Sequence, residues 1–341
     1  MKSLLASVIL SLFGMAAPQL SNAQPVADFY KAKGVTVIIG YDVGGGYDLY
    51  GRALARHLKQ HIPGAPTIVV QNMVGAGGLR AANFLYNIAP RDGSVIGLID
   101  QSIQLQQMLE PENVRLDVTK FNWIGRMVTN AAVLYSWHTA PVKTIKDLFD
   151  RDLLLASTGQ NSRIMSSFLN NQLGVKIKLI SGYKGTGDTI LALEREEVQA
   201  LTQPWSQLRT ESAEWLRDKK INLLLQMGVA SHPELKHVPL VVDLARSPDD
   251  RRLLELISSG SEIGRSIMSP PATAAERIAV LRSGFMATMN NPEFREEAKK
   301  LGLDLEIMSG EDLQAFIVKQ ADISPELLER ARKLAGLEAV K

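Results

Sequence analysis

The chain of 341 residues contains no cysteine. This absence excludes disulfide bonds, thiolate metal sites and cysteine nucleophiles from any account of its function. A chain of this length can bury enough apolar surface to fold without covalent cross-links. The absence is therefore compatible even with an oxidising compartment.

An excess of charge of one sign is also missing. The 38 Lys and Arg residues nearly balance the 36 Asp and Glu residues, and the formal net charge is +2. A protein that binds nucleic acid through its phosphates usually carries a basic surface. The composition gives no sign of one, so we expect no nucleic-acid partner.

The motifs of common enzymes and metal sites do not occur in the sequence. The five histidines lack H-E-x-x-H or similar spacing, and neither G-x-S-x-G nor the phosphate-binding G-x-x-x-x-G-K-S/T is present. His57 and His61 are four residues apart, but the Ile-Pro-Gly after His61 is typical of a helix end. Asp48 could act as a general base, although a carboxylate in a first helical turn is more often a cap. We expect no catalytic residue, no metal and no cofactor.

Long apolar runs are absent after the first 23 residues, whereas those residues have the pattern of an export signal. Lys2 supplies the positive end, residues 4–17 are nearly all apolar or small, and Ser21-Asn22-Ala23 resembles a cleavage site. A buried N-terminal helix is the alternative. We predict cleavage after Ala23, so that the mature chain begins at Gln24 in the periplasm. No cysteine follows the site to carry a lipid anchor.

The pattern of apolar residues predicts an α/β fold. Strands are expected at 35–39, 67–70 and 94–99, with helices after the first two, and a β-α-β-α-β order favours a mainly parallel sheet flanked by helices. The middle repeats this order, with strands at 153–156, 177–180, 198–201 and 221–225 and helices at 162–173, 186–196 and 205–219. After Pro233 we expect the chain to be chiefly helical, with helices at 250–259, 273–290, 292–301, 310–319 and 325–335. These elements suffice for two lobes, and no Gly/Ser-rich linker separates them.

Two glycine-rich turns join strands to helices in the first part of the chain, at residues 41–48 and 75–78. Glycine lets the backbone approach a ligand closely, and the start of a helix offers unpaired amides that suit an anion. A carboxylate could be held there without Arg or Lys. The alternative is that both are tight turns selected for packing.

Two turns in the middle of the chain have the same position between strand and helix. They are residues 157–162, Ser-Thr-Gly-Gln-Asn-Ser, and residues 182–188, Gly-Tyr-Lys-Gly-Thr-Gly-Asp. Parallel sheets place ligand sites at the carboxyl ends of their strands, where all four turns fall. Helix capping is the simpler role for any one hydroxyl. Arg126, Lys184 and Arg265 could pair with a ligand carboxylate, although a solvated surface charge is the ordinary role of each.

The four turns, in this order behind an export signal, resemble the tripartite tricarboxylate transporter receptor family, also called the Bug family. The resemblance is carried by short strings spread over most of the chain, namely Gly44-Gly45-Gly46-Tyr47-Asp48 with Arg52, Gln71-Asn72 with Gly75-Ala76-Gly77-Gly78, Ala89-Pro90-Arg91-Asp92-Gly93, Gly182-Tyr183-Lys184-Gly185, Pro270-Pro271, Asn291-Pro292-Glu293-Phe294 and Leu301-Gly302-Leu303. Asp42 departs from the family pattern, because it would repel an anion if it faced the ligand. Another departure is Arg195-Glu196-Glu197, where the family usually has Arg-Gly-Glu.

The resemblance implies a two-lobed periplasmic binding protein of the class II Venus flytrap type. It implies a signal peptide at 1–23, one lobe from 24–128 and 229–341, and a second lobe from 129–228. A ligand carboxylate would be bound by the turns, and the expected ligand-binding residues are Tyr41, Val43, Gly44, Gly45, Gly46, Gly77, Ser157, Thr158, Gly159, Tyr183, Gly185 and Thr186.

The implied function is capture of a small carboxylated solute by a monomer. The implied partners are the large and small membrane subunits of a secondary transporter. A periplasmic sensor subunit for a membrane kinase is the main alternative, and an enzyme on the same scaffold would need a motif that is missing.

Overall fold

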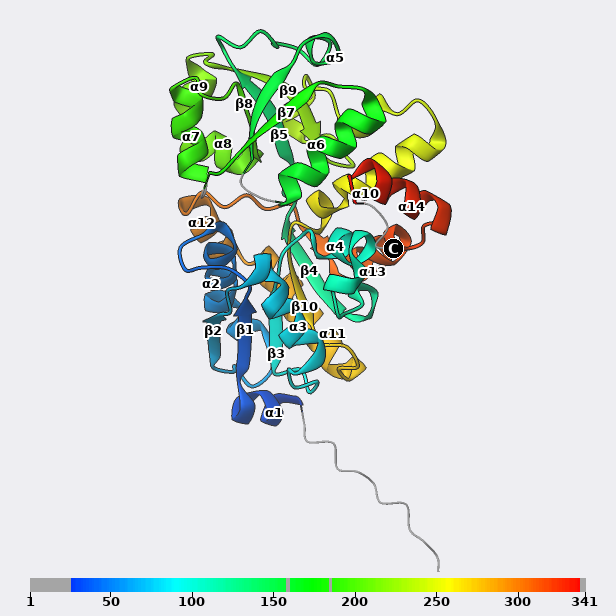
Figure 1. The fold of residues 1–341 in the computed structure, drawn as a ribbon. Coiled ribbons are helices and arrows are strands. Elements are labelled where there is room, and N and C mark those ends of the chain that lie inside the picture. The colour runs from blue at the N-terminus through cyan, green and yellow to red at the C-terminus, as the bar shows by residue number, and fades with distance from the viewer. Residues whose placement is uncertain (1–25, 158–159, 184–185, 338–341) are drawn as a thin grey trace, which may run out of the picture.

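The computed structural model describes residues 26–157, 160–183 and 186–337. They form two lobes, each built on one β-sheet, and Figure 1 shows the lobes one above the other. The expected export signal and cleavage site lie outside the described residues. The α/β two-lobed architecture expected from the sequence is confirmed.

The first lobe contains a six-stranded sheet in the order β11-β4-β10-β3-β1-β2. Its strands are β1 (Val35–Ile39), β2 (Ile68–Asn72), β3 (Val95–Leu98), β4 (Asn122–Val128), β10 (Arg265–Ser269) and β11 (Met308–Ser309). β1 pairs in parallel with β2 and β3, whereas β10, β4 and β11 are joined by antiparallel pairs. The α-helices of its part of the chain are α1 (Val26–Lys33), α2 (Gly46–Leu58), α3 (Leu79–Asn87), α4 (Ile103–Leu109), α11 (Ala275–Asn290), α12 (Pro292–Lys300) and α13 (Gly310–Ala321).

The second lobe contains a five-stranded sheet in the order β7-β6-β8-β5-β9. Its strands are β5 (Ala132–Trp137), β6 (Leu153–Ser157), β7 (Ile177–Ser181), β8 (Ala200–Pro204) and β9 (Ile221–Met227). β6 pairs in parallel with β7 and β8, and β5 runs antiparallel to β8 and β9. Its helices are α5 (Asp147–Asp150), α6 (Gln160–Leu173), α7 (Thr186–Glu194), α8 (Trp205–Glu211) and α9 (Ala213–Arg217).

Short 3-10 helices connect several of these elements. They are η1 (Lys59–His61), η2 (Ala76–Gly78), η3 (Pro111–Asn113), η4 (Val118–Lys120), η5 (Pro233–Leu235) and η6 (Val241–Leu244). In the described part of the chain no helix is long and apolar enough to cross a membrane.

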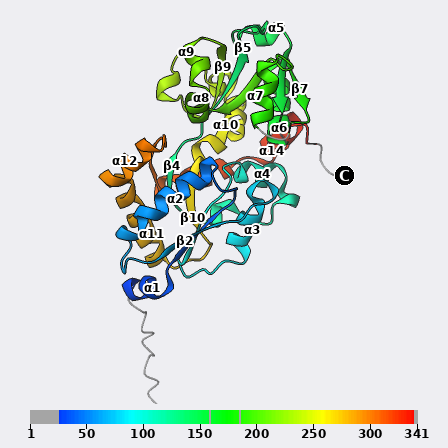
Figure 2. The same ribbon diagram turned by 90° about the vertical axis from the view of Figure 1, so that its left-hand side faces the viewer.

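Helices α10 (Pro248–Ile263) and α14 (Pro325–Leu334) lie at the junction of the two lobes, at the right of Figure 1. Leu253, Leu254 and Ile257 of α10 belong to the same apolar cluster as Leu155 of β6 and Phe168 of α6. The view in Figure 2, turned by 90°, also places α10 between the lobes. The C-terminal helices therefore join the core of the second sheet, and the lobe boundaries at 128/129 and 228/229 stay a prediction.

Both sheets are mixed, which is the main departure from the sequence-based expectation of mainly parallel sheets. The strands that were missed are β4, β5, β10 and the short β11, and each supplies antiparallel pairs. β4 and β5 are separated by only three residues, so the chain passes between the lobes through consecutive strands. No helix separates β4 from β5 along the chain, so the β-α alternation used for the expectation cannot detect these two strands.

Candidate ligand-binding site

A cavity of about 280 Å³ lies between the two lobes. Gln101, Ser102 and Leu105 contribute its wall from the end of β3 and α4, and Asn130 contributes from the connection between β4 and β5. The rest comes from the strands β5, β6, β7, β8 and β9, from the helices α6, α7 and α8, and from the last turns of α10. Its volume is just below the range of about 300–1,000 Å³ that ligand pockets usually have. The position between lobes is that expected of a flytrap ligand site.

Every described residue that lines the cavity is uncharged at neutral pH. The apolar ones include Leu105, Leu134, Leu155, Ile164, Met165, Leu169, Leu201, Met227 and Ile257. The polar ones are Gln101, Ser102, Asn130, Ser162, Ser166, Thr189, Thr202, Gln203, Gln207, Ser258 and Ser261. An arrangement of many apolar side chains with a few polar groups favours a small organic molecule.

Three polar atoms on the cavity residues are buried and have no hydrogen-bond partner, namely Asn130 Oδ1, Gln203 Nε2 and Ser258 Oγ. Gln203 and Ser258 are each 4% exposed. Gln203 Oε1 accepts from the Tyr135 hydroxyl, and Asn130 Nδ2 donates to Gln101 Oε1 at 2.6 Å. Only one polar atom of each carboxamide is thus satisfied by the protein. A buried polar group without a partner costs about 1–3 kcal/mol, so these atoms mark a place for a ligand or water.

The first glycine turn lies outside the lining of this cavity. Val43 is 71% exposed, and Gly44, Gly45 and Gly46 are exposed too. The amide of Gly44 donates to Asp48 Oδ2 at 2.9 Å. That amide already has a carboxylate partner within the chain, which leaves the first amides of α2 as the available donors of this turn.

Asp48 organises the start of α2. Its carboxylate is almost fully buried and accepts hydrogen bonds from Arg52 Nε at 2.8 Å and from Asn72 Nδ2 at 2.9 Å, besides that from Gly44. Burial alone would raise the pKa of Asp48, but the hydrogen bonds from Arg52, Gly44 and Asn72 outweigh it and lower the pKa below its usual value. Asp48 is therefore ionised and acts as a cap of the glycine turn, as its position in the sequence suggested.

Tyr41 and Tyr47 connect the turn to the cavity. Their rings are stacked with centroids 4.4 Å apart. Burial and then the neighbouring Asp100 carboxylate raise the pKa of Tyr41, so its hydroxyl stays protonated and donates to Asp100. The Tyr47 hydroxyl accepts from the amide of Gln101 at 3.0 Å, and Gln101 lines the cavity.

Arg265, the first residue of β10, places a cation beside the glycine turn. Its guanidinium carbon lies 4.9 Å from the ring centroid of Tyr47 and 5.4 Å from that of Tyr50. A Cβ on Gly46 would come within 2.8 Å of Arg265 Nη2, so glycine makes room for the guanidinium. Arg265 Nε is buried without a hydrogen-bond partner, and among the described residues no ion pair includes Arg265.

The acidic groups whose charges act on the same tyrosines as Arg265 have partners of their own. Asp304 pairs with Arg209, Glu306 contacts His232 at 3.2 Å, and Asp100 accepts from Tyr41. Arg265 is thus the candidate for an anionic ligand group. Arg126 was also expected from the sequence as a possible partner of a ligand carboxylate. It is buried, and its guanidinium forms an ion pair with the Glu262 carboxylate at 2.7 Å, so its charge is already paired within the protein.

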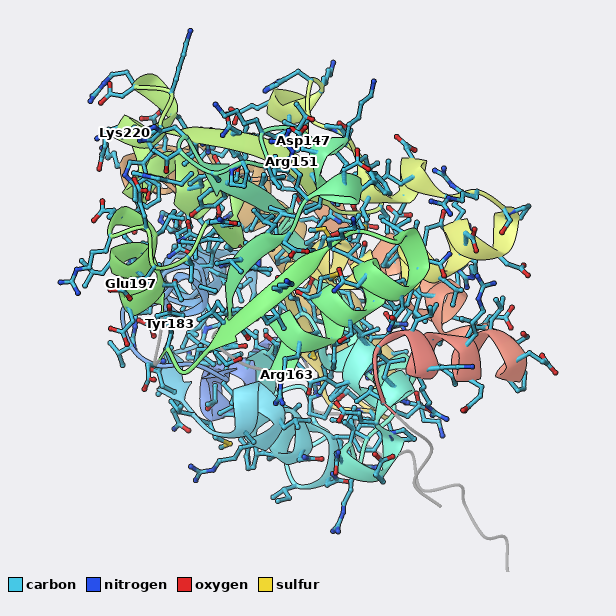
Figure 3. All side chains as sticks on the ribbon, turned by 45° about the horizontal axis from the view of Figure 1, so that its top comes forward. Asp147, Arg151, Arg163, Tyr183, Glu197 and Lys220 are labelled. Carbon is cyan, nitrogen blue, oxygen red and sulfur yellow. The ribbon has the colours of Figure 1, made fainter. Side chains whose placement is uncertain are left out.

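The other expected site residues are placed as follows. Ser157 is the last residue of β6, and it is buried and interacts with another group of the protein. Gly77 lies in η2, where it is exposed and has a φ of 60°. Tyr183 follows β7, as Figure 3 shows, and Thr186 begins α7. Thr158, Gly159, Lys184 and Gly185 lie outside the described residues.

Of the expected residues, Tyr41, Val43, Gly44, Gly45, Gly46, Gly77, Ser157 and Tyr183 are fully described, and none of these eight lines the cavity, although the neighbouring Ala156 and Ser162 do. Sequence reasoning missed Asn130, Gln203 and Ser258. They stand outside the glycine turns, and no local signal distinguishes them from ordinary polar residues. Among residues 26–157, 160–183 and 186–337, no group of three or more His, Asp or Glu side chains is placed to hold a metal ion.

Two proteins of known sequence are similar over much of their length. The chain is 23% identical over 319 residues to the UPF0065 protein in gbd 5'region of Cupriavidus necator, covering 90% of each chain. It is 28% identical over 196 residues to protein BugT of Bordetella pertussis, covering 54% of this chain and 59% of BugT.

Solved structures show the same fold at low identity. A TctC solute binding protein from Polaromonas aligns with a TM-score of 0.67 at 18% identity, covering 89% of this chain and 97% of that one. A Rhodopseudomonas palustris protein solved with adipate gives 0.61 at 18% identity, covering 89% and 97%. MatC of Rhodopseudomonas palustris with bound malate gives 0.59 at 19% identity, covering 88% and 98%.

The sequence model of the tripartite tricarboxylate transporter family receptor, TctC, matches residues 51–332. The match covers most of the chain and includes both sheets except β1. The resemblance noted from the glycine turns is confirmed, and the chain belongs to this family of periplasmic solute-binding receptors.

Proposed function

We propose that this protein captures a small carboxylated solute between its lobes in the periplasm. The observation that carries the proposal is the cavity walled by both lobes, in which three buried polar atoms have no partner. Family members are receptors rather than enzymes, and two proteins of the same fold were solved with adipate and with malate. The carboxylate end of the solute would lie near Arg265 and the first amides of α2, within the turn of Tyr41, Val43, Gly44, Gly45 and Gly46.

The proposed partners are the two membrane subunits of a tripartite secondary transporter, to which the receptor, a monomer, delivers its solute. The family name supports this role. Ligand binding would draw the lobes together about the strands that pass between them, near 126–132 and 227–231.

A thermal-shift screen of carboxylates against the mature protein tests the capture of a carboxylate. A ligand at about 100 times its Kd adds roughly 2.7 kcal/mol to the free energy of unfolding, which gives a clear shift. Amides of the same acids serve as uncharged controls. A screen in which carboxylates shift the melting temperature no more than these amides would contradict the proposal.

Export is tested separately. N-terminal sequencing of the protein from a periplasmic extract is expected to find Gln24 as the first residue. Recovery of a cytoplasmic protein that still begins with Met1 would overturn the assignment to the periplasm.

A further inference from the structure

We propose that Gln203 is a specificity-determining residue, whose Nε2 donates a hydrogen bond to an acceptor oxygen of the solute. Tyr135 is the positioning residue that holds Gln203 in the orientation this bond requires. The proposal rests on the proposed function, because it assumes that the solute occupies the cavity between the lobes. It adds the chemistry that one wall of the cavity recognises, which is an oxygen acceptor such as a carboxylate or carbonyl oxygen.

The strand pairing of the second lobe brings the two residues together. Gln203 lies on β8, lines the cavity and is 4% exposed. The antiparallel register of β5 and β8 places Val133 opposite Gln203, and Tyr135 follows Val133 by two residues. Because side chains alternate between the faces of a sheet, Tyr135 and Gln203 are diagonal neighbours on the same face.

The Tyr135 hydroxyl determines which end of the Gln203 carboxamide is left for a ligand. It donates to Gln203 Oε1, and the described residues offer it no other acceptor. Tyr135 is fully buried, and burial raises its pKa, so the hydroxyl keeps its proton. If the carboxamide turned over, this buried proton would lose its acceptor, which is costly. Gln203 Oε1 is therefore bound to Tyr135, and Nε2 is the atom that remains.

Gln203 Nε2 is a donor that the protein itself does not use. Within the described part of the chain it has no hydrogen-bond partner. Gln226, which lies opposite Val133 on β9, is a contrasting case: it is 1% exposed, and its Nε2 donates to the carbonyls of Leu235 and Val238. Gln226 is not among the residues that line the cavity. Since an N–H group can only donate, the complement of Gln203 in the solute is an acceptor, and a carboxylate oxygen forms the strongest such bond.

Titration calorimetry tests the role of Gln203. Malate, succinate, adipate, citrate, glutamate and benzoate are first titrated into the parent protein, and the acid that binds most tightly is the probe. Gln203→Leu removes the donor and should bind the probe at least tenfold more weakly, the effect of losing a hydrogen bond to a charged group. Gln203→Glu keeps an acceptor for the Tyr135 hydroxyl but replaces the donor with an oxygen. At pH 8 it should therefore bind a carboxylate more weakly still.

The outcomes separate the proposal from the function on which it rests. Binding of none of the six acids to the parent would overturn the proposed function, and the role of Gln203 with it. A parent that binds the probe, together with a folded Gln203→Leu variant of the same affinity, would overturn the role of Gln203 alone.

A double-mutant cycle tests the role of Tyr135. Tyr135→Phe removes the hydroxyl that orients Gln203 and should weaken binding of the probe about three- to tenfold. Combined with Gln203→Leu, it should cause no further loss of affinity, because the hydroxyl acts on the solute only through Gln203. Losses that add up in the double variant would show that Tyr135 does not act by positioning Gln203.

The matched control is Gln104→Leu. Gln104 of α4 is fully buried, its Nε2 donates to the Ile317 carbonyl at 2.8 Å, and its Oε1 has no partner among the described residues. It is thus half-satisfied like Gln203, but it is not among the residues that line the cavity. Gln104→Leu should bind the probe as the parent does, and thermal melts without ligand check that each variant folds. Equal losses of affinity in Gln104→Leu and Gln203→Leu would remove Gln203 from the site.

Discussion

At the scale of single residues, Arg265 is a cation beside the glycine turn for which the described residues provide no ion pair. Its guanidinium is held against Tyr47 and Tyr50 beside Gly46, and its Nε has no partner. A cation that is stacked on aromatic rings and left unpaired keeps its donors available for a carboxylate.

Arg265→Gln should therefore weaken binding of the carboxylate with the largest thermal shift by at least tenfold, with little effect on folding. Calorimetry and thermal melts of the free protein measure the two effects. Arg91→Gln, which removes an exposed charge from the same lobe, is the control and should bind normally. If both variants bind alike, Arg265 is only a packing residue.

Gly45 gives a second test at this scale. Its φ is −77° and ψ is 169°, and a Cβ there would lie 3.7 Å from the Asp42 carbonyl, so a side chain is tolerated. Gly45→Val should fold normally and weaken carboxylate binding at least tenfold, because the branched side chain blocks approach to the first amides of α2. Circular dichroism confirms the fold, and calorimetry measures the affinity. Parent-like binding by the folded variant would show that the turn is only a packing device.

At the scale of an element, the start of α2 depends on the ionised Asp48 carboxylate and its three hydrogen bonds. Asp48→Asn replaces an acceptor oxygen by a donor that faces Gly44 and Arg52. We expect it to lower the free energy of unfolding at pH 7 by about 1–3 kcal/mol. Urea denaturation measures the change, and Asp28→Asn, an exposed change in α1, is the control.

The difference in stability between the parent and Asp48→Asn should depend on pH. The pKa of Asp48 in the folded protein is below the usual pKa of an aspartate. Its contribution to the free energy of unfolding is therefore complete above the usual pKa and is lost as the pH falls through the folded pKa. The difference in stability between parent and Asp48→Asn should therefore shrink when the pH is lowered from 5 to 3. A difference that stays constant over this range would show that the charge of Asp48 does not stabilise the turn.

At the scale of the whole molecule, an ion pair joins the lobes. Arg209 of α8 contacts Asp304, which precedes β11, and also pairs with Glu234 at 2.9 Å. The backbone carbonyl of Asp304 accepts from the Tyr50 hydroxyl at 2.8 Å, which ties this contact to α2. The pair is therefore placed to stabilise a closed arrangement of the lobes.

Asp304→Ala should weaken solute binding about two- to fivefold, the effect of losing a partly exposed ion pair worth up to about 1 kcal/mol. Asp218→Ala, which breaks the exposed pair of Asp218 with Arg217, is the control and should have no effect. Small-angle scattering should show that saturating ligand compacts the parent. An unchanged radius in the parent would contradict closure of the lobes.

The sequence by itself determined the α/β class, most helices and the family. These features depend on local signals, such as the apolar spacing of β1 and the capping residues Ser309 and Ser324, whose hydroxyls accept from the amides of Asp312 and Leu327. Only the tertiary structure decided which polar groups meet at the ligand site. Asn130, Gln203 and Ser258 come from three distant segments, and what distinguishes them is burial without a partner. Whether a polar side chain lacks a partner depends on every chain segment packed around it, so no local pattern in the sequence can predict it.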